Sequence, residues 1–114
     1  MPKKYNSDLI RLQDILKAID DIEGFNRRSS LADPMAVMAI SYEIAIIGEA
    51  CAKLSELLRS NNPHIPWSDI IGMRHRIIHD YGKVSIARLK EVVESHLAPL
   101  KSEIEKIIIE LSTN

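Results

Sequence analysis

Apolar residues recur at helical spacing along most of the chain. Between Ser7 and Phe25 they follow the i, i+3, i+4, i+7 pattern of an amphipathic helix, and Gly24 is a plausible stop. Ser7 is the predicted N-cap of this helix. The polar segment that follows ends in Asp33-Pro34, an N-cap residue before a proline at the first helical position. We therefore expect a second helix to begin at Pro34.

The second predicted helix, from Pro34 to about Ser60, is apolar around most of its circumference. After Pro34, its only helix-breaking residue is Gly48. A helix this apolar is buried on more than one face. In a chain of 114 residues, a second buried face suggests contact with a partner chain. One side carries Val37, Ile40, Ile44, Ile47, Cys51, Leu54 and Leu58, and another carries Met35, Tyr42, Ile46 and Leu57.

The rest of the chain predicts two more helical segments. A proline-containing loop leads to a third helix from Trp67 to about Asp80, and Ser85 begins a fourth. Pro99 is expected to divide the fourth, because proline is tolerated in the first turn of a helix but not inside one. The pattern contains no repeat and no strand-like alternation. We predict one all-α domain over residues 1–114, a four- to five-helix antiparallel bundle.

Polar residues interrupt the apolar stripe of the third helix, in the stretch GMRHRIIHDYG. At about 100° per residue, Arg74 and Tyr81 fall inside the arc formed by its isoleucines. His75 and His79 fall at the border of the arc, and Arg76 and Asp80 point to water.

An arginine inside an apolar arc needs an anionic partner, because an unpaired buried charge costs several kcal/mol. One candidate is an internal carboxylate, that of Glu43 or Glu49 on the second helix. The other is a ligand phosphate, which a planar guanidinium binds through two hydrogen bonds. The two readings are compatible.

The two histidines also allow more than one interpretation. His75 and His79 are spaced i, i+4, which can hold a metal from one helical face, but no glutamate lies between them as in metalloprotease motifs. They can equally be surface or helix-end residues. Imidazole also suits general acid–base chemistry, since its ordinary pKa of about 6.5 lets it donate or accept a proton near neutral pH.

Composition and charge narrow the function classes. The formal net charge is −1 and the pI is near 6.4, so any RNA contact has to be local. Candidates for gripping RNA are Arg74 and Arg76, with Arg27 and Arg28. Cys51, the single cysteine, is expected to be buried and inert. Without an apolar leader or an apolar run of about 18 residues, we expect a soluble cytoplasmic protein.

The order Arg74, four residues, His79, Asp80, Tyr81 resembles the Arg-x-x-x-x-His-x-Tyr signature of HEPN-domain toxins, and most closely the HepT family. The stretches IIGEA at 46–50, IPW at 65–67 and GMRHRIIHDY at 72–81 add to the likeness. With the bundle layout, the resemblance covers almost the whole chain.

The resemblance implies a homodimeric, metal-independent endoribonuclease that needs no cofactor. Arg74 would bind and polarise the scissile phosphate, and His79 would act as general acid or base. The RNA's own 2′-hydroxyl would attack, giving a 2′,3′-cyclic phosphate and a free 5′-hydroxyl. His75 stands where the family has a polar residue, often asparagine, and could orient the phosphate or serve as a second acid–base group.

The resemblance also implies a toxin–antitoxin partnership. The partner would be a small MntA-type nucleotidyltransferase that transfers AMP from ATP to Tyr81, so that the bulky anion occupies the substrate phosphate site. A rival interpretation is a non-enzymatic helical dimer that docks such a partner and presents Tyr81, with Arg74 held by Glu43 or Glu49.

The predicted third helix adds a geometric argument for two chains. Arg74 and His79 lie about 140° apart on a straight helix, so one copy does not easily aim both at one phosphate. Two copies across a twofold axis would bring the arginine of one chain near the histidine of the other. We therefore expect the site at a dimer interface, and a monomeric variant to be inactive.

Overall fold

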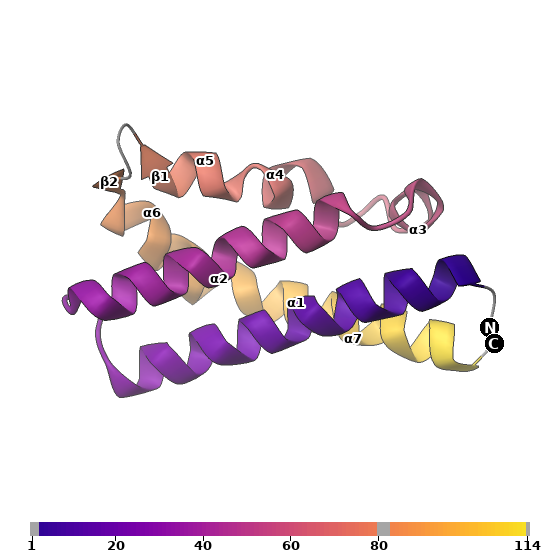
Figure 1. The fold of residues 1–114 in the computed structure, drawn as a ribbon, viewed down its shortest axis with the longest axis horizontal. Helices are drawn as coiled ribbons and strands as arrows, with labels where there is room; N and C mark the ends of the chain where they lie inside the picture. The colour runs from indigo at the N-terminus through magenta and orange to yellow at the C-terminus, as the bar shows by residue number, and fades with distance from the viewer. Residues whose placement is uncertain (1–2, 80–82, 114) are drawn as a thin grey trace.

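The computed structural model describes residues 3–79 and 83–113, with side chains described from Ser7 to Ile78 and from Lys83 to Thr113. The chain is almost entirely helical, which confirms the predicted all-α bundle (Figure 1). The helices are α1 (Lys3–Arg28), α2 (Pro34–Ala52), α3 (Glu56–Asn61), α4 (Trp67–Ile71), α5 (Met73–Ile77), α6 (Ile86–Glu91), the π-helical turn η2 (Val92–His96) and α7 (Leu97–Thr113). A two-stranded ribbon, β1 (Ile78–His79) and β2 (Lys83–Val84), follows α5.

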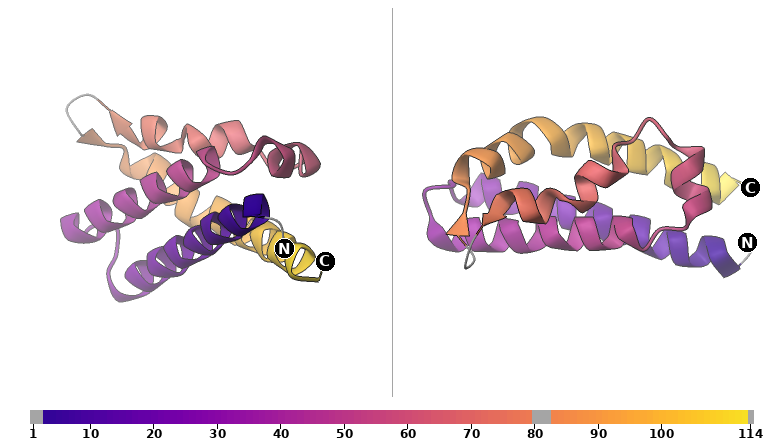
Figure 2. Two further views of the ribbon diagram at one scale, coloured as in Figure 1. Left: turned by 45° about the vertical axis from the view of Figure 1, so that its right-hand side comes forward. Right: turned by 90° about the horizontal axis from the view of Figure 1, so that it is seen from above.

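Helix α1 packs against both α2 and α7, and α2 also packs against α4 and α5. Viewed from above, α6 and α7 run along one side of the molecule and α2 along the other, with the two termini at the same end (Figure 2). One apolar core joins these elements, and aliphatic side chains supply most of it. Its fully buried members include Leu12, Ile15, Ile19, Ile22, Ile40, Ile44, Ile47, Ile77, Leu89 and Ile104.

The ends of α1 differ from the prediction. The helix begins at Lys3, so Ser7 is not its N-cap, and it continues through Gly24 to Arg28. The Arg28 side chain donates a hydrogen bond to the Gly24 carbonyl, and Arg27 and Arg28 place positive charge at the carbonyl end of the helix. Both contacts favour extension beyond glycine.

Helix α2 starts as predicted, but it ends earlier. Asp33 is its N-cap and accepts a hydrogen bond from the Met35 amide. The predicted end near Ser60 is wrong, because the helix stops at Ala52 and Ser55 caps a separate helix, α3. The buried Asp8 carboxylate accepts hydrogen bonds from the amide and the hydroxyl of Ser55, at 2.8 and 2.6 Å. This pairing across 47 residues holds the corner between α2 and α3.

By length and composition alone, α2 could cross a membrane, contrary to the expectation that no run is apolar enough. Half of that apolar stretch is buried inside the protein. Burial against α1, α4 and α5 explains the composition, since a core helix needs the same residues as a membrane span.

The C-terminal segment follows the prediction closely. Ser85 caps α6 by accepting a hydrogen bond from the Arg88 amide. Pro99 lies in the first turn of α7, and the π-helical turn Val92–His96 separates α7 from α6. Since proline has no amide hydrogen and its ring collides with the preceding turn, the wider turn precedes it.

Candidate functional site

The motif segment rests on α2 through a close backbone contact. A Cβ atom on Gly48 would lie 3.2 Å from the carbonyl oxygens of both Ile70 and Ile71, so a larger residue there would require the two backbones to shift apart by a few tenths of an ångström. Met73 and Ile77 of α5 are buried in the core. These contacts hold α5 against the core, and its three other side chains, those of residues 74–76, are exposed.

Arg74 is exposed, so its predicted position inside the apolar arc is wrong. The helix is interrupted at Gly72, and the buried residues of α5 are Met73 and Ile77. Arg74 lies about 100° around the helix from Met73 and about 60° from Ile77, at the edge of the buried side, and its side chain reaches solvent.

The predicted internal partners of Arg74 do not bind it. Glu49 forms an ion pair with Lys53 at 3.3 Å. Glu43 lies beside Asp21, and its Oε2 atom is buried without a hydrogen-bond partner. Among the described residues, no ion pair or hydrogen bond joins Arg74 to either glutamate. The guanidinium group is therefore available to an external anion.

His79 is not on the helix. Helix α5 ends at Ile77, and the next two residues form β1, in which Ile78 pairs with Val84 and His79 with Lys83. The Ser85 amide donates a hydrogen bond to the Ile77 carbonyl at 2.7 Å and closes this ribbon. The predicted angle of about 140° on a straight helix therefore does not apply, nor does the i, i+4 geometry of a helical metal site.

The sequence carried a signal for this ribbon. Asp80 and Gly82 are turn-forming residues, and they lie between the β-branched residues Ile78 and Val84. The apolar periodicity of residues 67–78 favoured a continuous helix instead, so the ribbon was not predicted. Asp80 and Tyr81 lie outside the described residues, so the predicted orientation of Tyr81 stays a prediction.

The segment around α5 is locally basic in a chain that is weakly acidic overall. Residues 72–90 contain five lysines and arginines but one aspartate, against a net charge of −1 for the whole chain. All five basic side chains are exposed, as is His75. Arg76 forms an ion pair with Asp69 at 3.0 Å. The five are Arg74, Arg76, Lys83, Arg88 and Lys90. A weakly acidic protein needs a local excess of exposed basic residues of this kind to hold a phosphate backbone.

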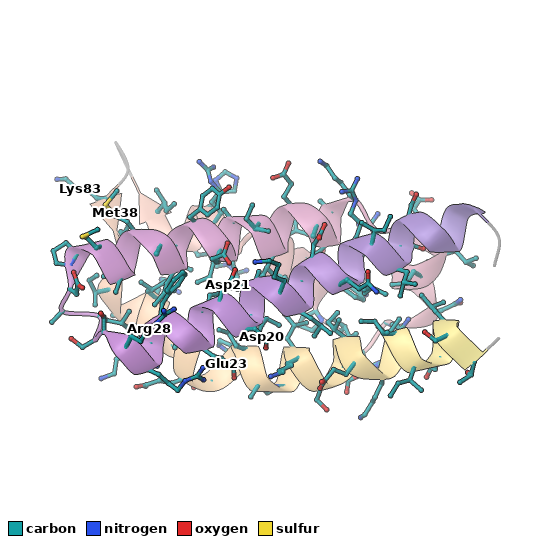
Figure 3. All side chains as sticks on the ribbon, turned by 60° about the horizontal axis from the view of Figure 1, so that its bottom comes forward. Asp20, Asp21, Glu23, Arg28, Met38 and Lys83 are labelled. Carbon is teal, nitrogen blue, oxygen red and sulfur yellow. The ribbon has the colours of Figure 1, made fainter. Side chains whose placement is uncertain are left out.

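An apolar stripe on the outside of α2 faces solvent in the single chain. Met35, Met38 and Tyr42 follow i, i+3, i+7 spacing and are 78%, 70% and 65% exposed. Met38 and Lys83 lie at the same end of the molecule (Figure 3). A second apolar face on α2 was predicted from the sequence, and in the single chain the structure leaves this stripe exposed.

Cys51 is fully buried, as predicted, and burial raises the pKa of its thiol to about 12. A thiol with so high a pKa carries almost no thiolate near neutral pH. Cys51 is therefore a packing residue.

The carboxyl pair Asp21–Glu43, between α1 and α2, makes stability depend on pH. Burial, and then the hydrogen bond with Asp21, raise the pKa of Glu43 to about 7, whereas that hydrogen bond lowers the pKa of Asp21. Because its pKa is raised in the folded protein, Glu43 stabilises the fold fully at a pH below its ordinary pKa of 4.5. This stabilisation is lost as the pH rises through 7. Because the pair is partly open to solvent, we expect the free energy of unfolding to fall by about 1 kcal/mol between pH 5 and 8.

Urea unfolding at several pH values tests this expectation. Glu43→Gln should flatten the decline, because the amide cannot lose a proton. Glu49→Gln changes a residue on the same helix that is paired with Lys53, and in this variant the free energy of unfolding should still fall with pH. An unchanged decline in Glu43→Gln would assign the pH dependence to other groups.

Comparisons with known proteins relate the chain to ribonucleases of one family. The model of a family described as HepT-like, ribonuclease HepT-like, matches residues 12–107. A protein of Methanocaldococcus jannaschii, provisionally named an RNase, is 35% identical over 85% of this chain and 84% of its own length. A protein of Thermococcus cleftensis named probable ribonuclease HepT is 33% identical over 84% of this chain and 91% of its own length. No solved structure matches at a significant level.

Proposed function

Because the chain belongs to the HepT-like ribonuclease family, we propose that it is a metal-independent endoribonuclease, the toxin of a HEPN/nucleotidyltransferase toxin–antitoxin pair. The observation that carries the proposal is the family match, which spans the entire motif segment. The exposed basic side chains of residues 72–90 support it, since they offer RNA a positively charged surface.

In this proposal, Arg74 binds the scissile phosphate through its exposed guanidinium group and stabilises the charge that develops there. His79 acts as general acid or base, and His75, exposed on α5, supports the phosphate. The 2′-hydroxyl oxygen attacks phosphorus while its proton passes to a base. The bond from phosphorus to the 5′-oxygen breaks, and that oxygen takes up a proton. The substrate supplies its own nucleophile, so no metal-bound water is required.

The proposal extends to a regulatory partner. An MntA-type nucleotidyltransferase would transfer AMP from ATP to Tyr81 in the cytoplasm and so block the phosphate site. The rival interpretation, a non-enzymatic module that presents Tyr81, relied on Arg74 being held by Glu43 or Glu49. Among the described residues Arg74 is exposed and binds neither carboxylate, which favours the enzyme.

An RNA-cleavage assay in the presence of EDTA tests the proposed activity. We expect the purified protein to cut RNA under these conditions and to leave 2′,3′-cyclic phosphate and 5′-hydroxyl ends, which end-labelling distinguishes from products of metal-dependent hydrolysis. Loss of cleavage in EDTA, with recovery on adding a divalent metal, would contradict the metal-independent mechanism.

We also propose that the enzyme is a homodimer built on the apolar stripe of α2. The helical angle between Arg74 and His79 no longer supports two chains, but the exposed stripe does. A twofold axis through it would bury Met35, Met38 and Tyr42 against their copies.

Charge placed in this stripe should separate the protomers. Met38→Glu would bury two like charges against each other, so we expect a shift from dimer to monomer in sedimentation velocity and at least tenfold slower RNA cleavage. Ile109→Glu is the matched control, since Ile109 is 62% exposed on α7, and it should leave mass and activity unchanged. A Met38→Glu protein that stays dimeric would exclude this face as the interface.

A further inference from the structure

The β1–β2 ribbon, which lies at one end of the molecule (Figure 1), places a lysine directly opposite His79. The two strands are antiparallel, and their register pairs Ile78 with Val84 and His79 with Lys83. In an antiparallel ribbon, residues directly opposite each other belong to the same face, with Cβ atoms about 4.5–5.5 Å apart. The register therefore makes residues 79 and 83 neighbours on one face of the ribbon.

The face that carries residues 79 and 83 looks away from the core. Ile78 and Val84, the preceding pair of the ribbon, are partly buried and pack against the apolar core. Because successive residues of a strand belong to opposite faces, the next pair lies on the outer face. Lys83 is exposed, as this alternation requires. A substrate can therefore reach positions 79 and 83 from the same side.

Backbone hydrogen bonds attach the ribbon to the helices on both sides. The Ile78 amide donates a hydrogen bond to the Arg74 carbonyl at the end of α5. The Ser85 amide donates one to the Ile77 carbonyl at 2.7 Å, where β2 passes into α6. A two-stranded ribbon is at best marginally stable by itself, so these contacts and the packing on the core support it. The ribbon thus continues directly from the helical turn that carries Arg74.

Lys83 differs from the other basic residues of the segment 72–90. Two of those residues lie on α5 and two on α6, so Lys83 alone shares the ribbon with His79. Arg76 is held by Asp69 at 3.0 Å. Among the described residues, by contrast, no ion pair or hydrogen bond involves the Lys83 ammonium group. Lys83 is thus the basic residue of this segment whose position and lack of a described partner suit a phosphate next to His79.

We propose that Lys83 binds the scissile phosphate from the position opposite His79, as a second cation beside Arg74. This inference rests on the proposed ribonuclease function. As the 2′-oxygen attacks phosphorus, negative charge increases on the non-bridging oxygens, and a donor already in place stabilises it. An ammonium group binds such an oxygen as a compact charge with three donors, whereas a guanidinium group binds through paired donors. Two cations on one phosphate therefore stabilise the transition state more than the bound RNA.

A lysine on a two-stranded ribbon can also have a purely structural role. Both strands are edge strands, and a charged edge discourages pairing with another chain. That role predicts more aggregation when Lys83 is replaced, but no specific effect on RNA. The two interpretations differ in whether the positive charge at position 83 contributes to phosphate binding, and the experiments below measure that contribution.

Binding of RNA of mixed sequence in which every ribose is 2′-O-methylated tests the contact without turnover, because this RNA has no attacking hydroxyl. We expect Lys83→Ala to weaken binding about fivefold or more beyond the loss seen for Lys90→Ala. Lys90 is exposed and basic in the same segment but lies on α6, so its replacement measures the contribution of one general positive charge. Equal losses in the two variants would overturn the proposal.

Steady-state cleavage of unmodified RNA in EDTA tests the transition-state contact. Lys83→Ala should lower kcat about tenfold or more, whereas Lys90→Ala should act mainly on KM. Lys83→Arg keeps a positive charge and hydrogen-bond donors and should retain most of the rate. A kcat for Lys83→Ala equal to that for Lys90→Ala would show that Lys83 does not act on the reacting phosphate.

Chemical rescue separates the charge from the rest of the side chain. Lys83→Cys treated with 2-bromoethylamine regains an ammonium group, whereas iodoacetamide attaches a neutral amide of similar length. Cys51 is buried and its thiol has a pKa of about 12, so alkylation of the folded protein is confined to position 83. We expect kcat to be at least about fivefold higher for the ammonium adduct than for the amide adduct. Equal rates would leave only the structural role.

The two assays also separate this inference from the proposed function. A protein that binds the methylated RNA through Lys83 but cuts no RNA would contradict the ribonuclease activity and leave the phosphate contact standing. A protein that cuts RNA equally well after Lys83→Ala and Lys90→Ala would contradict the role of Lys83 and leave the ribonuclease activity standing.

Discussion

Replacing Arg74 with alanine is expected to slow RNA cleavage in EDTA by a factor of about 10² to 10³. That is the effect of removing one preorganised donor from a developing charge, about 3–4 kcal/mol of transition-state stabilisation. The side chain is exposed, so the melting temperature should not change. Arg74→Lys keeps the charge but loses the paired hydrogen-bond donors, so its cleavage rate should lie between those of the parent and of Arg74→Ala. Lys106→Ala, an exposed change on α7, should cleave as the parent does.

His79→Ala provides an independent test of the same centre. Loss of a general acid–base group costs about 10² to 10⁴ in rate, so we expect a comparable defect. Both variants should also relieve growth arrest when the protein is expressed without its partner. Cleavage that persists in both would contradict the assignment of the active site.

Replacing Gly48 with valine is expected to destabilise the fold by about 3 kcal/mol or more. A Cβ atom at this position already lies 3.2 Å from two backbone carbonyl oxygens of α4, and the branched side chain would push α2 and α4 apart. The motif segment follows α4 directly, so activity should fall even at temperatures where the variant remains folded. Chemical unfolding and the cleavage assay measure the two effects.

Gly24 provides the matched control, since it too lies inside a long helix. A Cβ atom there would meet only the ends of the Arg27 and Arg28 side chains, at 3.4 Å or more. Gly24→Ala should therefore stabilise the protein by about 0.5–1 kcal/mol through helix propensity alone. Gly48→Ala gains the same helix propensity. A difference between the two variants in the change of unfolding free energy therefore measures the cost of the close contact between Gly48 and α4. Equal stabilisation would show that α2 and α4 do not depend on it.

Local signals predicted much of the fold correctly. Asp33-Pro34 and Ser85 begin helices because their side chains satisfy amide groups within the next turn, which involves only neighbouring residues. Pro99 marks the start of α7 for an equally local reason. The buried faces of the long helices follow from apolar periodicity, because a stripe of aliphatic side chains has to leave water. The motif that identifies the family is likewise a property of residue order.

Tertiary contacts decided where the helices of the site begin, end and point. Helix α2 stops at Ala52 because Asp8, 47 residues away, holds Ser55 as the cap of α3. Arg74 lies at the edge of the buried side of α5 and is exposed. His79 leaves the helix because Ile78 pairs with Val84. Periodicity measures only the angle between residues on an unbroken helix, so it placed Arg74 in the core. Two local breaks, at Gly72 and at the ribbon that begins with Ile78, interrupt that helix, and Arg74 between them is exposed.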